Sequence, residues 1–355
     1  MPPLSVPRQA APQLSVIIPT VNEADHLPGL LEQLRRQRGI TLEILLADGQ
    51  STDGTPQLAE RLGVRTIACP VRGRGAQMNA AAVHASSAHC LFLHADSALP
   101  DPDLLHNALV HFQRLQAVAV KPCAGHFRLR FIDPPFDPPW ILRYFQHKTA
   151  LNRPECIHGD QGLLISCAFF RQLGGFRSEL PFLEDQHLAG QVAREGIWIT
   201  LPGTLESSAR RFRQEGVIRR ILLNAMILMA FHADFREFLA QAPRLYRTQD
   251  TSRPLRLLPF FDLLAALDRQ TEWRDAWQRW YRLGRFARRS LWQLFFLGDL
   301  LITPLRPTGR HPLTALHDRL LQPLLDFTPC DLMFALLLRF GTRLATKRIA
   351  QKKSI

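Results

Sequence analysis

The sequence predicts an α/β protein built on a mixed, mostly parallel sheet. Apolar runs that are typical of buried strands alternate with helix-like segments over the first hundred residues. These runs are hydrophobic almost throughout, as in parallel strands that are covered on both faces. Each run stops at a polar turn, and the run from Leu91 to Leu93 stops at His94, Ala95, Asp96 and Ser97. Such alternation implies helices on both faces of the sheet and right-handed crossovers.

The individual elements follow from apolar periodicity and from Gly and Pro breaks. The predicted parallel strands are Leu14–Ile18, Leu42–Ala47, Arg65–Ala68 and Cys90–His94. Later strands are expected at Val118–Lys121, Gly125–Phe131, Leu163–Ser166 and Ile197–Leu201, and helices at Trp140–Leu151 and Leu183–Glu195. A proline-rich break at Pro134–Pro139 separates two of these elements, and everything after Val217 is predicted to be helical.

Composition restricts the function classes. Hydrophobic residues make up 46% of the 355 residues and charged residues 21%, which is typical of a globular protein. The net charge of +13 favours a phosphate-bearing partner: nucleic acid, anionic lipid or a nucleoside diphosphate. No zinc-finger spacing or RNA-binding signature is present, so we expect no nucleic acid. The six cysteines form no C-x-x-C pair, which favours free thiols in a reducing compartment.

Four stretches carry side chains suited to chemistry, and each has a simpler structural alternative. Asp48, Gly49, Ser51 and Asp53 follow a strand and can contact a nucleotide, or form an ordinary turn. The basic loop from Arg72 to Asn79 opens a helix and can cradle an anion, or be a solvated loop. Asp96 can hold Mg²⁺ or Mn²⁺, or cap the next turn.

The last two candidates lie further along the chain. Glu184 and Asp185 begin a helix, where carboxylates are favoured by the helix dipole, and they can also supply a general base. Arg210 and Arg211 are able to grip a diphosphate, although surface arginines are common. The order of all these stretches carries more information than any one of them.

In combination, the sequence resembles a family 2 glycosyltransferase with the GT-A fold. The stretches that carry the resemblance are Ser15–Glu23, Asp48–Thr55, Arg72–Asn79, His94–Asp96, Gly159–Gln161 and Glu184–Asp185. More narrowly, it is similar to a bacterial subgroup described as radical-SAM/selenodomain-associated glycosyltransferase. The resemblance covers residues 14–247, so we expect a disordered N-terminus at 1–13, a catalytic domain at 14–247 and a helical, basic C-terminal extension at 248–355.

The resemblance implies a role for each matching residue. It implies that Asp185, with Glu184, is catalytic, and that Gly159, Asp160 and Gln161 line the acceptor side. Arg210 or Arg211 would hold the departing diphosphate. The implied nucleotide-binding residues are Pro19, Thr20, Asn22, Glu23, Asp48, Gly49, Ser51, Arg74, Gln77, Asn79, His94 and Ala95.

The implied metal site departs from the family pattern. The family's D-x-D motif reads His94-Ala95-Asp96 here, so Asp96 is the expected metal ligand while the first carboxylate is absent. The resemblance implies a divalent cation, Mg²⁺ or Mn²⁺, but the lost negative charge leaves metal dependence open. The histidine is also the main argument for a rival interpretation, a catalytically weak nucleotide-binding or scaffold protein.

The expected reaction is transfer of a sugar, with inversion, from a nucleotide-diphosphate sugar to a hydroxyl acceptor. A nucleotidyltransferase of the same fold is a second rival, disfavoured because Pro19, Thr20, Val21, Asn22 and Glu23 stand where its basic glycine-rich loop would be. Sugar, base, acceptor and oligomeric state are not readable from the sequence.

The C-terminal extension has two interpretations. Trp273, Trp277, Trp280 and Trp292 lie near helical spacing with arginines between them. A helical cap that packs on the catalytic domain is one interpretation, because aromatic stripes are usually core. A membrane-surface platform is the other, with aromatics at the headgroups, cations on anionic lipid and a lipid-linked acceptor. No apolar stretch reaches the roughly 18 residues of a membrane span, so a cytoplasmic protein is expected, at the inner face of the membrane in the second interpretation.

Overall fold

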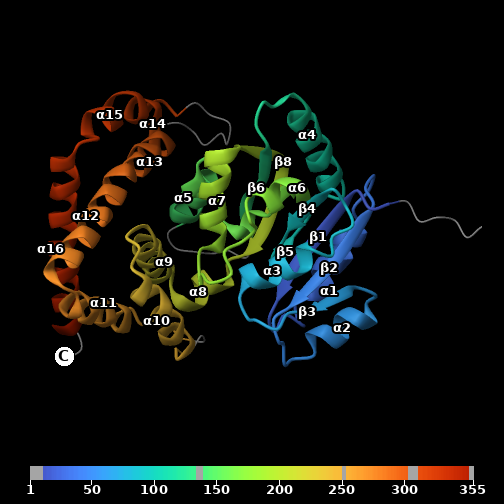
Figure 1. The fold of residues 1–355 in the computed structure, drawn as a ribbon, viewed down its shortest axis with the longest axis horizontal. Helices are drawn as coiled ribbons and strands as arrows, with labels where there is room; N and C mark the ends of the chain where they lie inside the picture. The colour runs from blue at the N-terminus through green and yellow to red at the C-terminus, as the bar shows by residue number, and fades with distance from the viewer. Residues whose placement is uncertain (1–10, 133–138, 250–252, 303–310, 352–355) are drawn as a thin grey trace, which may run out of the picture. The chain divides into compact units, whose positions relative to one another are not determined.

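The computed structural model describes residues 11–132, 139–249, 253–302 and 311–351. It divides into two compact units, residues 1–209 and residues 210–355 (Figure 1). The predicted boundary at residue 247 rested on resemblance rather than on compactness, and it stays a prediction. Most of the N-terminal stretch at 1–13, which was predicted to be disordered, lies outside the described residues. Residues 134–138 of the predicted proline-rich break also lie outside them.

The first unit is an eight-stranded mixed sheet in the order β3-β2-β1-β4-β7-β6-β8-β5. Its strands are β1 (Leu14–Thr20), β2 (Leu42–Asp48), β3 (Arg65–Ala68), β4 (His89–Phe92), β5 (Ser97–Ala98), β6 (Cys123–Ile132), β7 (Leu163–Ser166) and β8 (Ile197–Ser208). The first four strands are parallel, while β7 runs antiparallel to both β4 and β6. This arrangement confirms the predicted α/β class with a mostly parallel sheet.

Helices cover both faces of this sheet (Figure 1). They are α1 (Leu27–Arg35), α2 (Thr55–Arg61), α3 (Arg74–Ala82), α4 (Leu104–Val118), α5 (Pro139–Lys148), α6 (Cys167–Gln172) and α7 (Glu184–Glu195), with short 3₁₀ turns η1 (Pro154–Cys156) and η2 (Gly159–Gln161). Residues of α1 and α4 pack in one core cluster, and residues of α3, α6 and α7 in the other.

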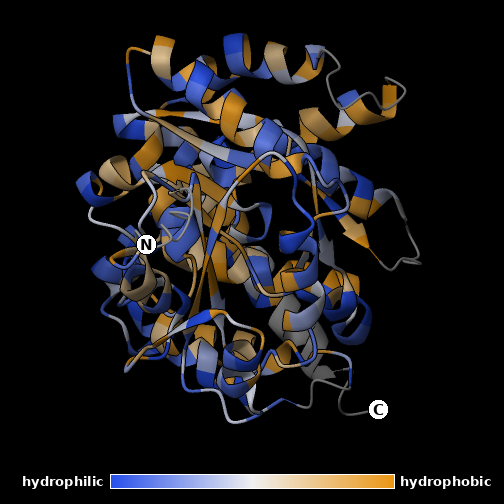
Figure 2. Ribbon diagram, turned by 90° about the vertical axis from the view of Figure 1, so that its right-hand side faces the viewer, coloured by the Kyte–Doolittle hydropathy of each residue, from blue (hydrophilic) through white to orange (hydrophobic). Residues whose placement is uncertain are grey.

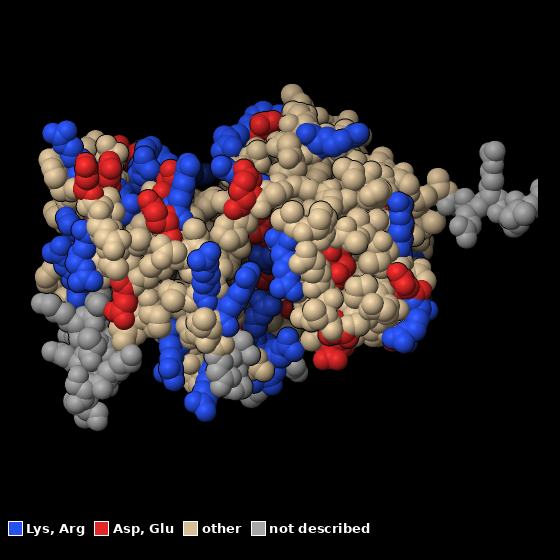
Figure 3. Space-filling model, turned by 60° about the horizontal axis from the view of Figure 1, so that its bottom comes forward, with Lys and Arg blue, Asp and Glu red and all other residues tan. Residues whose placement is uncertain are grey.

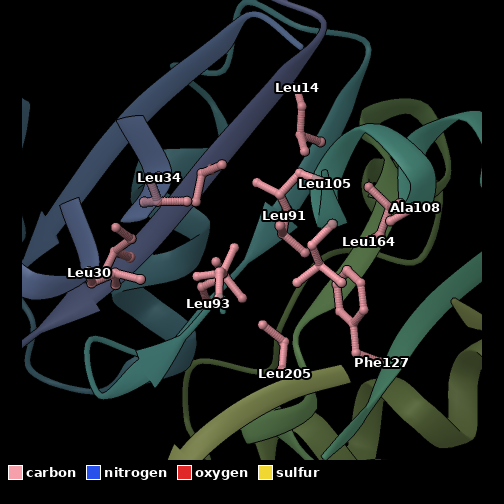
Figure 4. Packing of buried hydrophobic residues seen from close by; sticks show 14 of the residues in the cluster. Leu14, Leu30, Leu34, Leu91, Leu93, Leu105, Ala108, Phe127, Leu164 and Leu205 are labelled. Carbon is pink, nitrogen blue, oxygen red and sulfur yellow. The ribbon is translucent and has the colours of Figure 1, made fainter. Parts of the chain in front are cut away.

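Alternation along the strands separates the two cores. Leu91 and Leu93 belong to the cluster with α1 and α4, whereas Cys90 and Phe92 belong to the cluster with α3 and α7. Figure 4 shows Leu91, Leu93, Leu105 and Phe127 pointing toward one another in the first of these clusters. The hydrophobic colouring of the strands in Figure 2 reflects burial on both faces, which explains the near-continuous apolar runs in the sequence.

One predicted strand is wrong. Val118–Lys121 is not a strand, because α4 runs to Val118 and a turn follows before β6 begins at Cys123. The side chains of Val118 and Val120 are 77% and 102% exposed. β-branched residues favour strands only where a neighbouring strand or core covers them, and nothing in the described structure covers these two.

The second unit is helical, as predicted for the region after Val217. Its helices are α8 (Arg210–Glu215), α9 (Val217–His232), α10 (Arg236–Arg247), α11 (Leu258–Gln270), α12 (Trp273–Arg289), α13 (Trp292–Ile302), α14 (Pro312–Leu316), the π-helical η3 (His317–Leu321), α15 (Gln322–Leu325) and α16 (Thr328–Gln351). The pair α12 and α16 forms its most extensive contact.

Two of the four tryptophans of the stripe, Trp280 and Trp292, belong to the core of this unit, whereas Trp273 is 75% exposed. Trp280 and Trp292 are 6% and 1% exposed, and Trp280 Nε1 donates to Asp268 Oδ1 at 2.8 Å. The prediction that the aromatic stripe lies at a lipid surface is therefore wrong for these two residues. The prediction that the extension packs on the catalytic domain stays untested. Among the described helices, none alone is long and apolar enough to cross a membrane.

Candidate active site

The carboxyl ends of β1 and β2 present two buried polar atoms. Thr20 and Asp48 are register partners at the ends of these strands. Thr20 Oγ1 and Asp48 Oδ1 are buried and have no hydrogen-bond partner among the described residues. A buried polar atom without a partner is destabilising, so such atoms commonly receive a ligand. Both residues were predicted to bind nucleotide, and the neighbouring Pro19 lies inside β1.

Side chains fix the loops that follow β1 and β2 against each other. The Asn22 N–H donates to Ser51 Oγ at 2.9 Å, and the Thr52 N–H donates to Asn22 Oδ1 at 2.8 Å. Asn22 has a left-handed φ of 58°, which asparagine tolerates better than most residues. The Glu23 N–H donates to Thr55 Oγ1 at 3.0 Å. The structure thus gives Asn22 and Ser51 a loop-positioning role, and their predicted nucleotide contacts stay predictions.

The basic loop is anchored on the end of β2. Arg72 donates from Nε and Nη2 to the carbonyls of Gly49 and Gln50, both at 3.0 Å. Gln77 is buried and donates at 2.8 Å to main-chain carbonyls at the ends of β1 and β2. A Cβ at Gly49 would lie 2.6 Å from the Gln77 amide carbon, so this close approach requires glycine. Gln77 therefore holds together the two strand ends that carry Thr20 and Asp48.

Asn79 joins α3 to the segment that precedes α7. Its Nδ2 donates to the carbonyl of Phe176 at 2.7 Å, and its Oδ1 accepts from the Phe176 N–H at 2.9 Å. The amide of Asn79 is thus engaged with the protein, and its predicted nucleotide contact stays a prediction. The bond matters for the site because the chain after Phe176 leads to the carboxylates at the start of α7.

An ion pair brings the basic loop to the carboxylates at the start of α7. Arg74 Nε lies 2.9 Å from Glu184 Oε1, and the Glu184 side chain is 3% exposed whereas that of Arg74 is 45% exposed. A Cβ at Gly75 would lie 3.3 Å from Glu184 Cβ, so α3 and α7 approach closely here. Burial raises the pKa of Glu184 above its ordinary value, and the nearby Arg74 opposes that shift.

Asp185, Gly159 and His94 converge beside this pair. The Gly159 N–H donates to Asp185 Oδ2 at 2.7 Å. A Cβ at Gly159 would lie 2.8 Å from His94 Nε2 and 3.4 Å from Asp185 Oδ2. Arg74 Nη1 lies 3.4 Å from His94 Nε2, and since Arg74 can only donate, the imidazole accepts there. The sequence predicted all four residues, and the fold brings them together.

The centre is locally acidic. Asp96, Asp160, Glu184 and Asp185 all act on Arg74 and together raise its pKa, although burial alone would lower it. Burial raises the pKa of Asp160 to about 7, and the neighbouring Asp185 and Asp96 add to the effect. Asp160 Oδ1 is also buried and has no partner among the described residues. Arg74 is thus one cation facing four carboxyl groups.

The side chains present fit a divalent cation only if a substrate completes its coordination. Within the described ranges, no group of three or more His, Cys, Asp or Glu side chains is arranged to hold a metal ion. Asp96 offers a hard oxygen ligand, and His94 stands where the family has a second one. Mg²⁺ is commonly held by one or two carboxylates together with substrate phosphates and waters, which is the donor set available here.

The remaining predicted residues are placed as follows. Ala95 is buried, and Gln161 is fully buried with its Nε2 donating to the Cys156 carbonyl at 2.6 Å. Gly159, Glu184, Asp185 and His94 line a pocket whose inner wall is apolar. Arg210 and Arg211 open α8 in the second unit, and their assignment to the diphosphate stays a prediction.

Sequence reasoning missed one polar group near Asp185, the predicted base. His158 lines the same pocket, and its Nδ1 lies 3.2 Å from Gln186 Nε2, the residue after Asp185. Burial lowers the pKa of His158, while the carboxylate of Asp185 opposes that shift. Its position directly before Gly159, Asp160 and Gln161 is the sequence signal that could have identified it.

Comparison with known proteins finds a family match within the first unit. Residues 15–171 match the family described as "Glycosyl transferase family 2". The "PGL/p-HBAD biosynthesis glycosyltransferase Rv2957" of Mycobacterium tuberculosis is 39% identical over 102 residues, covering 27% of this chain and 40% of that protein. The "Succinoglycan biosynthesis protein ExoA" of Rhizobium meliloti is 34% identical over 214 residues, covering 52% of this chain and 60% of that protein. The matches thus span only part of each relative.

Solved structures are similar at a lower level. Residues 1–349 of S. aureus TarS in complex with UDP give a TM-score of 0.49 at 16% identity, over 93% of this chain and 92% of that chain. The mannosyltransferase PcManGT from Pyrobaculum calidifontis, in complex with GDP-Man and Mn²⁺, gives 0.46 at 20% identity, over 93% and 87%. Likeness at this level carries no conclusion about substrate. The observed sheet and helices, together with the family match, confirm the predicted GT-A fold class, and the part of the first unit that matches family 2 glycosyltransferases is residues 15–171.

Proposed function

We propose that this chain transfers a sugar, with inversion, from a nucleotide-diphosphate sugar to a hydroxyl acceptor. One observation carries the proposal: the same sheet unit holds two groups of polar side chains. Thr20 and Asp48 end neighbouring strands with buried oxygens that have no partner among the described residues, and four carboxyl groups surround Arg74. A nucleotide and a reacting sugar need such neighbouring sites at the carboxyl edge of an α/β sheet. The narrower radical-SAM/selenodomain-associated subgroup stays a prediction.

Asp185 is the general base in this proposal. It accepts the proton of the acceptor hydroxyl while that oxygen bonds to the anomeric carbon, and the bond from this carbon to the diphosphate breaks on the opposite face. Glu184 is a positioning residue, because its buried carboxylate holds Arg74. Arg74, with Arg210 or Arg211, offsets negative charge on the departing nucleoside diphosphate.

A divalent cation is part of the proposal, with Asp96 as its protein ligand and His94 beside it. When bound, such an ion neutralises charge on the diphosphate. The acidic surroundings of Arg74 support the need for a cation. Without a cation, a substrate diphosphate would add negative charge to a centre that already holds four carboxyl groups.

The acceptor side is formed by Gly159, Asp160 and Gln161 in this proposal. Asp160 Oδ1 is buried without a hydrogen-bond partner among the described residues, and in this proposal it accepts from a hydroxyl group of the acceptor. The named relatives act in the biosynthesis of PGL/p-HBAD and of succinoglycan, and a lipid-linked acceptor handled in the cytoplasm, at the inner membrane face, agrees with such roles.

The substitution Asp185→Asn tests the proposal. It keeps the shape of the side chain and removes the base, so we expect release of nucleoside diphosphate from UDP-, GDP- and dTDP-sugars, with acceptor extracts present, to fall about 10²–10⁴-fold. Binding should persist, measured as the rise in melting temperature with UDP, GDP, dTDP, CDP or ADP, with and without Mn²⁺. Asp103→Asn, at an exposed aspartate before α4, is the matched control.

The outcomes separate the rival functions. Full turnover by Asp185→Asn would show that another group is the base. Nucleotide binding by the wild-type chain without any turnover would favour the nucleotide-binding scaffold. Turnover that consumes a nucleoside triphosphate and releases pyrophosphate would favour the nucleotidyltransferase. Nucleotide binding without Mn²⁺ that is as strong as with it would contradict the role of Asp96 as a metal ligand.

A further inference from the structure

Exposed apolar side chains gather on the last four α-helices of the second unit. Among the described residues, twelve large hydrophobic side chains between Leu294 and Leu344 are at least 42% exposed. They are Leu294, Leu301, Ile302, Leu316, Leu320, Leu324, Phe327, Met333, Leu336, Leu337, Phe340 and Leu344. Single exposed apolar residues are normal on protein surfaces, but a concentration of this kind marks a binding surface. We call these residues the apolar surface.

The apolar surface follows helical periodicity in α16. Met333, Leu336, Leu337, Phe340 and Leu344 recur at the spacing that places them on one side of a helix. The opposite side of α16 is already used within the unit, because Ala335 is fully buried and packs against α12. The helices α12 and α11 both contact α16, while the side that carries Met333, Leu336, Leu337, Phe340 and Leu344 is exposed.

The helices that carry this surface can lie on a bilayer but not cross it singly. The segments Pro312–Leu325 and Thr328–Leu344 together have the hydropathy of a membrane span, but they are bent by 100° at the break between them. At 1.5 Å per residue they are about 21 Å and about 26 Å long. A hydrocarbon core is about 30 Å thick, so each segment is too short for a full span.

Charge distinguishes a lipid surface from a second copy of the chain. The only acidic residue of α16 is Asp331, which is 4% exposed and paired with Arg288 at 2.6 Å. Arg343 is exposed beside Phe340 and Leu344, and Lys347 and Arg348 follow in the same helix. Apolar residues flanked by cations complement an anionic bilayer. Two copies meeting through this side would bring cations against cations.

We propose that the apolar surface docks this protein onto an anionic lipid bilayer, with the exposed side of α16 and the Leu316–Leu320–Leu324 stripe set into the headgroup and upper acyl region. Arg343 contacts lipid phosphates. This proposal does not depend on the transfer reaction, and it uses other residues than the tryptophan platform that was one of the two interpretations of the sequence.

The test is flotation of the full-length chain with vesicles of phosphatidylcholine alone or mixed with phosphatidylglycerol. We expect binding to the anionic vesicles. The double variant Leu336→Glu/Phe340→Glu should lower that partitioning at least about tenfold, since it removes two exposed apolar contacts and adds two anions. Arg343→Gln should lower it about fivefold, the amount expected for one cation near an anionic surface.

The matched control is Val118→Glu/Val120→Glu, which alters two exposed valines of the first unit in the same way. It should bind vesicles like the wild type. Circular dichroism melts should be unchanged in all variants, because the altered side chains are exposed. The proposal is overturned if the wild type ignores anionic vesicles at low salt, or if Leu336→Glu/Phe340→Glu floats as well as the wild type. It is equally overturned if light scattering finds a dimer that this variant splits and that does not bind lipid.

Discussion

Single glycines decide how closely the side chains of the candidate active site approach one another. Gly159 donates its N–H to Asp185, and a side chain there would meet the ring of His94. The backbone of Gly159 needs no special φ, so crowding alone excludes a larger residue. The residue types around the site could be predicted from the sequence, but this contact could not.

We expect Gly159→Ala to lower turnover strongly while leaving the fold intact. The new Cβ would lie 2.8 Å from His94 Nε2, so the ring or the η2 turn must shift, and the base Asp185 would shift with its donor. Nucleoside diphosphate release, measured beside the melting temperature, checks this. Gly190→Ala in α7 is the control, because nothing lies within 4 Å of its Cβ and the change should stabilise the helix by about 0.5–1 kcal/mol. Equal activity of the two variants would contradict the assigned geometry.

The Asp160 carboxyl group gives the protein a specific pH dependence. Its pKa is about 7 in the folded protein against an ordinary value of 3.8, so the folded state holds a proton that the unfolded state releases between these pH values. The contribution of Asp160 to the free energy of unfolding is therefore present below about pH 4 and is lost as the pH rises through 7.

Asp160→Asn should remove this dependence. Relative to the metal-free wild type, we expect the variant to gain stability progressively from pH 4 to pH 8, because the buried charge that develops in the wild type never forms. Thermal unfolding midpoints of both proteins across this range provide the measurement. A difference that stays constant with pH would show that folding does not shift the pKa of Asp160.

At the scale of elements, close approach of two helices organises the second unit. Gly284 lies in α12, and a Cβ there would lie 2.2 Å from the Asp331 carbonyl oxygen and 2.5 Å from the Ala335 nitrogen of α16. Because these are backbone atoms, no rotamer change can relieve the contact. Arg288 in the same helix is buried and bonds Asp331 and Asp326. The sequence predicted helices here, whereas their pairing depends on residues far apart along the chain.

Gly284→Ala should destabilise the second unit by about 1–3 kcal/mol or more, the usual effect of overpacking. Denaturant unfolding followed by tryptophan fluorescence is suitable, since Trp280 and Trp292 are buried in this unit. Gly341→Ala in α16 is the matched control, because its Cβ meets nothing within 4 Å and should be neutral or stabilising. A wild-type midpoint for Gly284→Ala would contradict the close packing of α12 on α16.

At the scale of the whole molecule, the positive net charge of the chain contrasts with the acidic side chains gathered at the candidate active site. The chain carries +13, and on the face drawn in Figure 3 Lys and Arg side chains are spread between larger uncharged areas. The candidate active site, in contrast, gathers four carboxyl groups around one arginine. The phosphate-bearing partner indicated by the net charge stays a prediction, and in the proposed function a cation held near Asp96 is what would let a diphosphate enter this centre.

The sequence by itself determined the strands β1 to β4, the helical second unit and the residue types of the site, because these depend on local apolar patterns and turn chemistry. It also carried the family resemblance, which local motifs in a fixed order are enough to establish. Tertiary structure alone decided that Arg74 pairs with Glu184, that Asn79 binds the chain before α7, and that α16 leaves an apolar side exposed. These contacts join residues distant in sequence, and burial and pairing are properties of the packed chain rather than of any segment.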